Sequence, residues 1–325
     1  MSGSIGGTGG FTKTGNYSLT LSGTNSYGGG TTISTGTIVA AATNALGTGG
    51  LQMSGGTFTM GGFTTVSGNL SSTVTTATVQ NADSLPATLV VGGDNTSTTY
   101  SAIIADGTGG GALSFAKTGT GSLTLSGANT YTGGTQITGG SLVVSGSITG
   151  STTAAGGALA GTGTTGAVTV NAGGIVSPGT SLATGTLNTG ALTFSGGGTF
   201  ALEINTTTSS ASLENVAGGL TLGTTAPALT LTDLGANVAL ASQTAFTFIT
   251  CTGGWDGNDF SFGGNLIPNG GIFTYGANTF QLNYNVGVSS NSVVLTVIPE
   301  PDACLNLLGG LSLLAGMSRF RRRKA

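Results

Sequence analysis

The sequence predicts an all-β protein: a right-handed parallel β-helix (β-solenoid) with a C-terminal β cap region and a single C-terminal transmembrane helix. Three observations lead to this fold. One segment of about 30 residues occurs twice, glycine supplies 63 of 325 residues while only 5% are charged, and an apolar run followed by basic residues ends the chain. Gly and β-branched residues disfavour helices, and the low charge argues against ordinary disorder. We therefore expect an almost purely β body.

The repeat occurs at residues 11–39 and again at residues 115–144. Aligned without a gap at an offset of 104 residues, the copies share side chains that chance in a chain rich in Gly and Thr would hardly reproduce. These are Phe11/Phe115, Lys13/Lys117, Asn25/Asn129 and Tyr27/Tyr131. A repeat of this kind is typical of a solenoid, in which each coil buries its apolar face on its neighbours.

Each copy predicts three short strands. Leu19-Thr20-Leu21-Ser22 alternates apolar and polar residues, as a strand with one buried face does, and the second copy repeats this pattern. Further strands are expected at 31–33 and 37–39, with their counterparts at 135–137 and 141–144. Glycines mark the corners between the strands, and Asn25 and Asn129 can tolerate a left-handed backbone there.

We expect three regions along the chain. Residues 1–212 form the solenoid, residues 213–298 a β region that caps it, and residues 299–325 a tail. The cap is predicted because the last coil of a solenoid exposes unpaired strands, and because aromatic residues gather there: Phe246, Phe248, Trp255, Phe260, Phe262, Phe273, Tyr275, Phe280 and Tyr284. Residues 1–10 lack the basic and apolar segments of a signal peptide, so we expect the true start to lie upstream.

The tail has three parts in order. Pro299-Glu300-Pro301 comes first, then the apolar run 303–317, then a basic cluster formed by Arg319, Arg321, Arg322, Arg323 and Lys324. Fifteen residues make roughly 22 Å of helix, enough for a thin bilayer with flanking residues. The positive-inside rule keeps the basic cluster cytoplasmic and places the body across the membrane. The alternative is an amphipathic helix docked on the core.

The repeat resembles the autotransporter-associated β-strand repeat, and residues 161–187 resemble passenger-domain segments of autotransporters. The tail resembles the PEP-CTERM sorting signal. The second resemblance implies export from a Gram-negative bacterium, a transient anchor in the inner membrane, and cleavage near Pro299-Glu300-Pro301 by an exosortase-type protease. It also implies a signal peptide, which residues 1–10 do not supply. The chain shows no membrane barrel of alternating strands such as autotransporters carry, so self-transport is not implied.

Charge excludes one class of function. The only cations before residue 299 are Lys13 and Lys117. Nucleic-acid binding needs clustered Lys or Arg to neutralise phosphates, so no nucleic-acid partner is expected. The chain has no His, which removes the usual general base and most zinc sites. We expect no cofactor and no enzyme activity, and Cys251 is expected to be a buried small apolar residue.

Two acidic groups remain as candidates for chemistry. Asp256, Asn258 and Asp259 form the densest acidic cluster and make a weak calcium candidate, although the same residues are equally typical of a turn. Glu203 and Glu214 are the only glutamates of the body. A polysaccharide-degrading β-helix enzyme would need such a carboxylate pair, but no motif supports it.

The sequence therefore predicts an exported structural protein of the cell surface or extracellular matrix, with a membrane anchor that is removed. The main alternative is a surface adhesin or polysaccharide-binding module, for which an exopolysaccharide would be the partner. The remote alternative is the β-helix enzyme.

Overall fold

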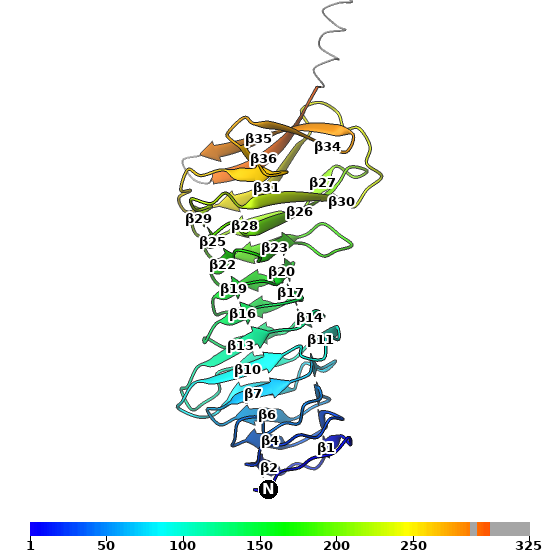
Figure 1. Cartoon of the computed structure of the whole chain (residues 1–325), viewed down its shortest axis with the longest axis vertical. Helices are drawn as coiled ribbons and strands as arrows, with labels where there is room; N and C mark the ends of the chain where they lie inside the picture. Colours follow the sequence, from blue (N-terminus) through cyan, green and yellow to red (C-terminus); the bar gives the residue numbers. More distant parts are fainter. Residues whose placement is uncertain (287–290, 300–325) are drawn as a thin grey trace, which may run out of the picture.

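The computed structural model describes residues 1–286 and 291–299. These residues form a long rod of stacked coils, with residue 1 at one end and strands β34 to β36 at the other (Figure 1). Within them the chain forms strands and turns and no helix. The predicted parallel β-solenoid is confirmed. The predicted transmembrane helix at 303–317 lies outside the described residues.

The rod has three faces, each a ladder of short parallel strands. The first face begins as one sheet and continues as a second, the two joined by a single parallel bridge between Ser72 and Tyr100. In order along the rod its strands are β1 (Phe11–Lys13), β3 (Thr31–Ile33), β5 (Leu51–Met53), β8 (Leu70–Ser71), β11 (Thr98–Tyr100), β14 (Ser122–Leu125), β17 (Ser141–Val144), β20 (Ala158–Gly161), β23 (Ile175–Pro178), β26 (Thr199–Asn205) and β30 (Ala228–Asp233).

The second face likewise consists of two sheets in succession, with Thr130 N–H donating to Ile104 O where they meet. Its parallel strands are β2 (Ser18–Leu21), β4 (Thr37–Ala40), β6 (Thr57–Met60), β9 (Thr78–Asn81), β12 (Ile103–Ala105), β15 (Ala128–Asn129), β18 (Ser147–Ile148), β21 (Thr164–Thr165), β24 (Thr186–Thr189), β28 (Leu213–Val216) and β31 (Ala245–Cys251).

The third face is a single sheet that starts later in the chain. Its strands are β7 (Thr64–Ser67), β10 (Ala87–Val91), β13 (Leu113–Lys117), β16 (Thr135–Ile137), β19 (Thr152–Ala154), β22 (Val168–Asn171), β25 (Leu192–Ser195) and β29 (Leu220–Thr221). Before β7 this face is irregular, although Asn25 N–H still bonds Asn44 O and Asn44 N–H bonds Thr64 O. The first coils therefore have two regular faces and one looser face.

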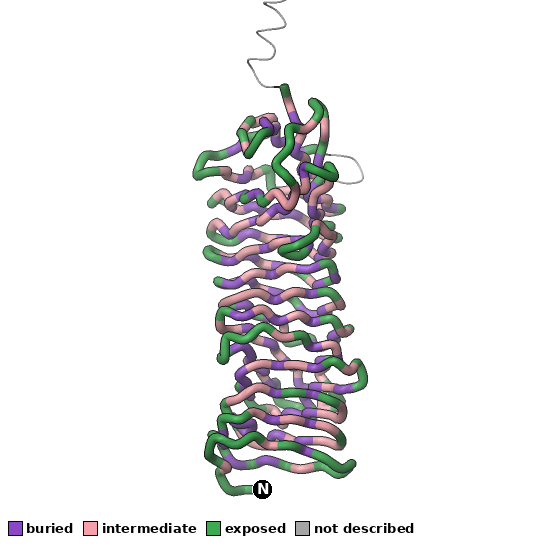
Figure 2. Tube along the Cα trace, turned by 90° about the vertical axis from the view of Figure 1, so that its right-hand side faces the viewer, coloured by how far each residue is buried: buried purple, intermediate pink, exposed green. Residues whose placement is uncertain are grey.

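The core is a column of apolar side chains that stack coil on coil. Leu19, Ile38, Phe58 and Val79 lie at paired positions in successive strands of the second face. Figure 2 shows buried positions recurring along each coil, with exposed residues at corners and loops. Parallel register forces this stacking, because the inward position of one strand is paired with the inward position of the next.

The strands predicted in the repeats are confirmed within about one residue. β3 and β16 cover 31–33 and 135–137, and β4 and β17 cover the third strand of each copy. The prediction omitted β1 and β13, which contain the repeated Phe and Lys, and it placed a corner where the short strand β15 lies. It was wrong about Asn25 and Asn129, neither of which has a left-handed backbone.

The two copies lie on different faces of the rod. Phe11 belongs to β1 on the first face, whereas Phe115 belongs to β13 on the third face. Coil length explains the shift: Thr31 and Leu51 are paired 20 residues apart, but Ser72 and Tyr100 are paired 28 residues apart. The longer coil between the copies rotates the second copy by one face.

Antiparallel strands close the far end of the rod. β36 (Asn291–Ile298) pairs antiparallel with β31, and it is followed in the sheet by β35 (Asn278–Val286) and β34 (Ile272–Tyr275). On the first face β30 is followed by the hairpin β32 (Phe260–Phe262) and β33 (Asn265–Ile267), while β27 (Ser210–Ala211) pairs with the end of β26. Parallel pairing thus continues past residue 212, through β31 and the Ala228–Ser261 pair of β30 and β32.

Aromatic rings join this end to the solenoid. Phe260 packs against Phe194 and Phe200 of the last coils, with ring centroids 5.9 and 6.1 Å apart. Tyr284 stacks on Trp255 at 4.8 Å, and its hydroxyl accepts the Phe260 N–H at 2.7 Å. The region therefore shares one core with the coils that it covers.

Candidate functional site

The repeated lysines are buried at corners of the coil, where they bind backbone carbonyl groups. Lys117 is 1% exposed, and its Nζ donates to the carbonyl oxygens of Thr118, Gly119 and Gly139 at 2.7, 3.3 and 3.4 Å. Gly139 belongs to the next coil, so one ammonium group ties two successive corners together. Burial lowers the pKa of Lys117, and the charge of Asp94 opposes that change.

Lys13 makes the equivalent bonds in the first copy. Its Nζ donates to the carbonyl oxygens of Thr14, Gly15 and Thr35 at 2.9, 2.6 and 3.3 Å. These acceptors occupy the same repeat positions as those of Lys117, although the copy lies on another face. The two cations of the described body are therefore bound internally, and neither forms part of a cationic surface.

An aromatic pair accompanies each lysine. The rings of Phe11 and Tyr27 are 6.1 Å apart, and those of Phe115 and Tyr131 are also 6.1 Å apart. Each tyrosine hydroxyl is 2.6 Å from a threonine Oγ1 in the following strand, Thr31 or Thr135. This contact satisfies both hydroxyl groups inside the core.

The repeated asparagines link three coils. Asn129 Oδ1 accepts the Ile104 N–H of the preceding coil at 3.0 Å, and its Nδ2 donates to Ser147 O of the following coil at 3.0 Å. Asn25 makes the matching bonds to Ile5 N–H and Ala45 O. The repeated asparagines and lysines thus hold successive coils in register.

The two body glutamates are buried and do not form an exposed pair. Glu214 lies at a core position of β28, paired with Leu187 on one side and Ile249 on the other, and it is 0% exposed. Neither of its carboxylate oxygens has a hydrogen-bond partner among the described residues. Burial raises the pKa of Glu214 to about 8, and the nearby Thr189 hydroxyl opposes this change.

Glu203 occupies a different environment on β26. It is 7% exposed, and its Oε2 accepts the Ser212 hydroxyl at 3.4 Å. Burial raises its pKa to about 6, and the Ser212 hydrogen bond lowers it again in part. The Glu214 carboxylate does not lie on the surface of the rod, whereas a glycosidase needs two carboxylates at its substrate.

The calcium candidates form a turn. Asp256 Oδ2 accepts the Gly223 N–H at 2.8 Å and the Asn258 side-chain amide at 2.9 Å. Partial burial would raise the pKa of Asp256, but these hydrogen bonds outweigh it and the pKa lies below its usual value. Burial alone raises the pKa of Asp259. No group of three His, Cys, Asp or Glu gathers within residues 1–286 and 291–299, and calcium binding here stays a prediction.

Cys251 lies in the core, as the sequence predicted, and Pro299 follows the last described strand. Cys251 is 2% exposed in β31, and burial raises the pKa of its thiol. Pro299 is exposed directly after β36. The other sorting residues, Glu300, Pro301 and the arginines, lie outside the described part. In that part no helix has the length and apolar character to cross a bilayer.

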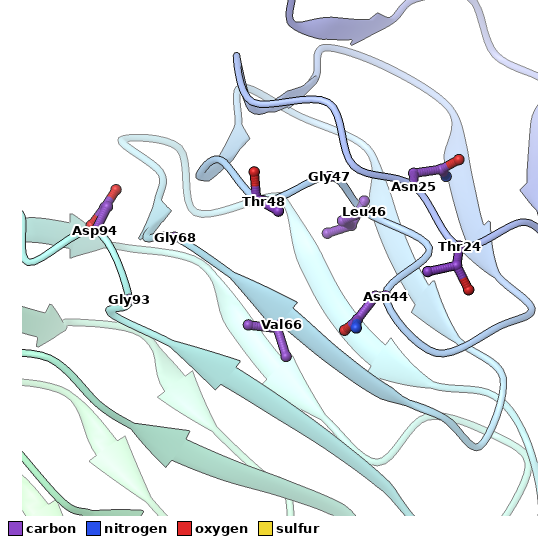
Figure 3. A pocket seen from close by; sticks show the side chains of 10 residues that line it. All are labelled: Thr24, Asn25, Asn44, Leu46, Gly47, Thr48, Val66, Gly68, Gly93 and Asp94. Atoms are coloured by element: carbon purple, nitrogen blue, oxygen red, sulfur yellow. The ribbon is translucent and has the colours of Figure 1, made fainter. Parts of the chain in front are cut away.

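The structure reveals a groove that the sequence did not indicate. It has a volume of about 310 Å³ and crosses four successive coils on the irregular part of the third face. Figure 3 shows its lining, with Asp94 at one end, Thr24 and Asn25 at the other, and Val66 between them. The remaining lining residues are Asn44, Leu46, Gly47, Thr48, Gly68 and Gly93.

Strand β7 lines part of this groove, and two of its polar side chains point inward while its apolar side chain points outward. Thr65 and Ser67 point into the core, whereas Val66 is 41% exposed. Thr65 pairs with Leu89, so a threonine stands at a position that the next coil fills with leucine. The order Thr65-Val66-Ser67 is the sequence signal that could have located the groove. A pattern analysis that assigns apolar residues to the core would have placed Val66 inside and overlooked it.

Residues 11–40 and 115–144 match the family model of the passenger-associated-transport-repeat. No curated protein matches the chain significantly. The repeat and the β-solenoid together identify an autotransporter-associated type of repeat in this chain, and this kind of repeat points to an exported or surface-located protein.

Proposed function

We propose that the protein is a structural rod of the cell surface or extracellular matrix of a Gram-negative bacterium. The observation that carries the proposal is the ladder of parallel strands, which contains two passenger-type repeats and ends in antiparallel strands. A ladder of this kind supplies length and surface, since each coil contacts only its neighbours.

The use of the repeat side chains supports a structural role. Lys117, Asn129 and Tyr131 are each at most 1% exposed. Lys117 and Asn129 bond to neighbouring coils, and the Tyr131 hydroxyl contacts Thr135 four residues on. The repeat therefore presents no reactive group to solvent through these residues. The buried positions of Glu203 and Glu214 agree with a rod that has no catalytic role.

The tail supplies the proposed route to the surface. In this proposal residues 303–317 anchor the chain in the inner membrane, and an exosortase-type protease cuts near Pro299-Glu300-Pro301. The exposed position of Pro299 directly after β36 supports the proposal, because a protease needs an accessible segment beyond the last paired strand.

The experiment is to replace Pro299, Glu300 and Pro301 with alanine in a host that has an exosortase. The expected result is that full-length chain accumulates in the inner membrane, whereas the natural chain is released. Fractionation and immunoblotting measure the two pools. Replacing the exposed residues Thr180, Ser181 and Leu182 with alanine gives a matched control that should be released normally. Efficient release of the tail variant would overturn the sorting route.

A further inference from the structure

We infer that the groove on the irregular third face binds a short stretch of a neutral polysaccharide. The groove crosses successive coils through residues 24–25, 44–48, 66–68 and 93–94, so its long direction follows the rod. Three coil spacings of about 4.8 Å give a length of roughly 14 Å. An extended polymer can lie along this path, and the inference does not depend on the proposed export route.

The inverted strand β7 is the first argument. Thr65 Oγ1 is buried with no partner among the described residues, which costs about 1–3 kcal/mol relative to a bonded hydroxyl. The opposite order would place an apolar side chain inside and a hydroxyl outside. The inverted order instead exposes Val66 in the groove, which the buried Leu46 also lines. Departures from local rules of this kind are expected at functional sites.

The lining combines an apolar floor with polar ends, which is the chemistry of a sugar site. The Val66 side chain is 41% exposed and can contact the C–H face of a sugar ring, whereas Leu46 is buried and supports the floor from below. The exposed Thr48 hydroxyl and Asp94 carboxylate can bond sugar hydroxyls from the rim (Figure 3). Asn44 Oδ1, like Thr65 Oγ1, is buried without a hydrogen-bond partner among the described residues.

The charged groups of the groove favour a neutral ligand. No Lys or Arg lines the groove, and its only charged group is Asp94. The carboxylate of Asp94 accepts hydrogen bonds from Thr96 and Asn69; these outweigh the effect of partial burial, and the pKa lies below its usual value. The group is therefore ionised at neutral pH and repels anionic sugars.

Gly93 gives the sharpest test of the site. A Cβ at Gly93 would meet nothing within 4 Å, and its backbone φ is not positive, so a leucine there should extend into open groove without straining the fold. Gly254 has the same properties but lies far away near Trp255, which makes Gly254→Leu the matched control. Val66→Ser removes the apolar floor, and Val143→Ser changes a partly exposed valine of β17 outside the groove.

The experiment is a calorimetric titration of the full chain with oligosaccharides. The neutral ligands are cellotetraose, maltotetraose and tetra-N-acetylchitotetraose, and the anionic ligand is tetragalacturonate. At least one neutral sugar should bind and the anionic sugar should not. Gly93→Leu and Val66→Ser should each weaken binding at least about tenfold, equal to about 1.4 kcal/mol, while Gly254→Leu and Val143→Ser leave it unchanged. Thermal unfolding of each variant confirms that it folds.

Two results would overturn the inference. One is the failure of all three neutral tetrasaccharides to bind the natural chain. The other is binding that survives Gly93→Leu and Val66→Ser, because the sugar would then lie elsewhere. Both readouts are made in vitro on purified chain, so they are independent of whether the tail directs release.

Discussion

The hydroxyl of Tyr131 lies 2.6 Å from Oγ1 of Thr135, and the same 2.6 Å contact joins Tyr27 to Thr31 in the first copy. The two contacts recur although the copies lie on different faces of the rod. The repeat therefore specifies a local unit of two successive strands, independent of the face on which the unit falls.

Tyr131→Phe should destabilise the rod by about 1–3 kcal/mol, because Thr135 Oγ1 would be left buried without its partner. Urea unfolding measures the change. Tyr17→Phe is the control, since Tyr17 is 89% exposed and its substitution should have no effect. The double variant Tyr131→Phe with Thr135→Val should recover part of the loss, and equal stability of Tyr131→Phe and the natural chain would contradict the role of this bond.

Lys117→Met should also destabilise the rod, by about 1–3 kcal/mol, because three carbonyl oxygens at two corners lose a charged donor. The methionine keeps most of the buried aliphatic stem, so the change isolates the ammonium group. Amide hydrogen exchange should show the loss around residues 117–119 and 139. A global loss with no local increase in exchange at these corners would indicate a different cause.

Glu214 should make the rod less stable as the pH rises. An unfolded glutamate titrates near about 4.3, whereas burial raises the pKa of Glu214 to about 8. Between these values the unfolded carboxyl has lost its proton and the folded one retains it. The free energy of unfolding should therefore fall with increasing pH, by up to about 1.4 kcal/mol per pH unit, and the contribution of protonated Glu214 is lost as pH passes through about 8.

Glu214→Leu tests this dependence, because leucine matches the apolar neighbours Leu187 and Ile249 in the same core row. The variant should be more stable than the natural chain at pH 8 and should show a flatter stability profile between about pH 5 and pH 8. Glu203→Gln is the comparison: with a pKa of about 6, Glu203 should affect only the lower part of this range. An unchanged profile in Glu214→Leu would refute the assignment.

Phe260→Ala should loosen the closed end of the rod. Phe260 contacts rings from the coils and from the antiparallel strands, and truncation of a buried phenylalanine costs about 3–5 kcal/mol. The variant should aggregate more readily, because the last parallel strands would become accessible as open edges. Light scattering during heating measures the aggregation. Phe63→Ala is the control, because it removes an exposed ring and should not increase aggregation.

Local patterns were sufficient for the class of fold and for three strands of each repeat copy. The alternation in residues 19–22 and the glycine corners predict short strands, and two copies of one segment predict stacked coils. The first strand of each copy was missed because Phe-Thr-Lys and Phe-Ala-Lys end in a lysine that ordinary patterns assign to the surface. Its burial depends on carbonyl groups of the next coil, about 22 residues away.

The sequence by itself determined that this chain is β, repetitive and poor in charge, because those properties depend on residue types and short spacings. Only the tertiary structure decided which face each copy occupies, because the lengths of intervening coils add up along the rod. It also decided that Glu214 is buried between Leu187 and Ile249, and that Val66, Asn44 and Asp94 line one groove. These residues are far apart in the chain, and the parallel register of successive coils brings them together.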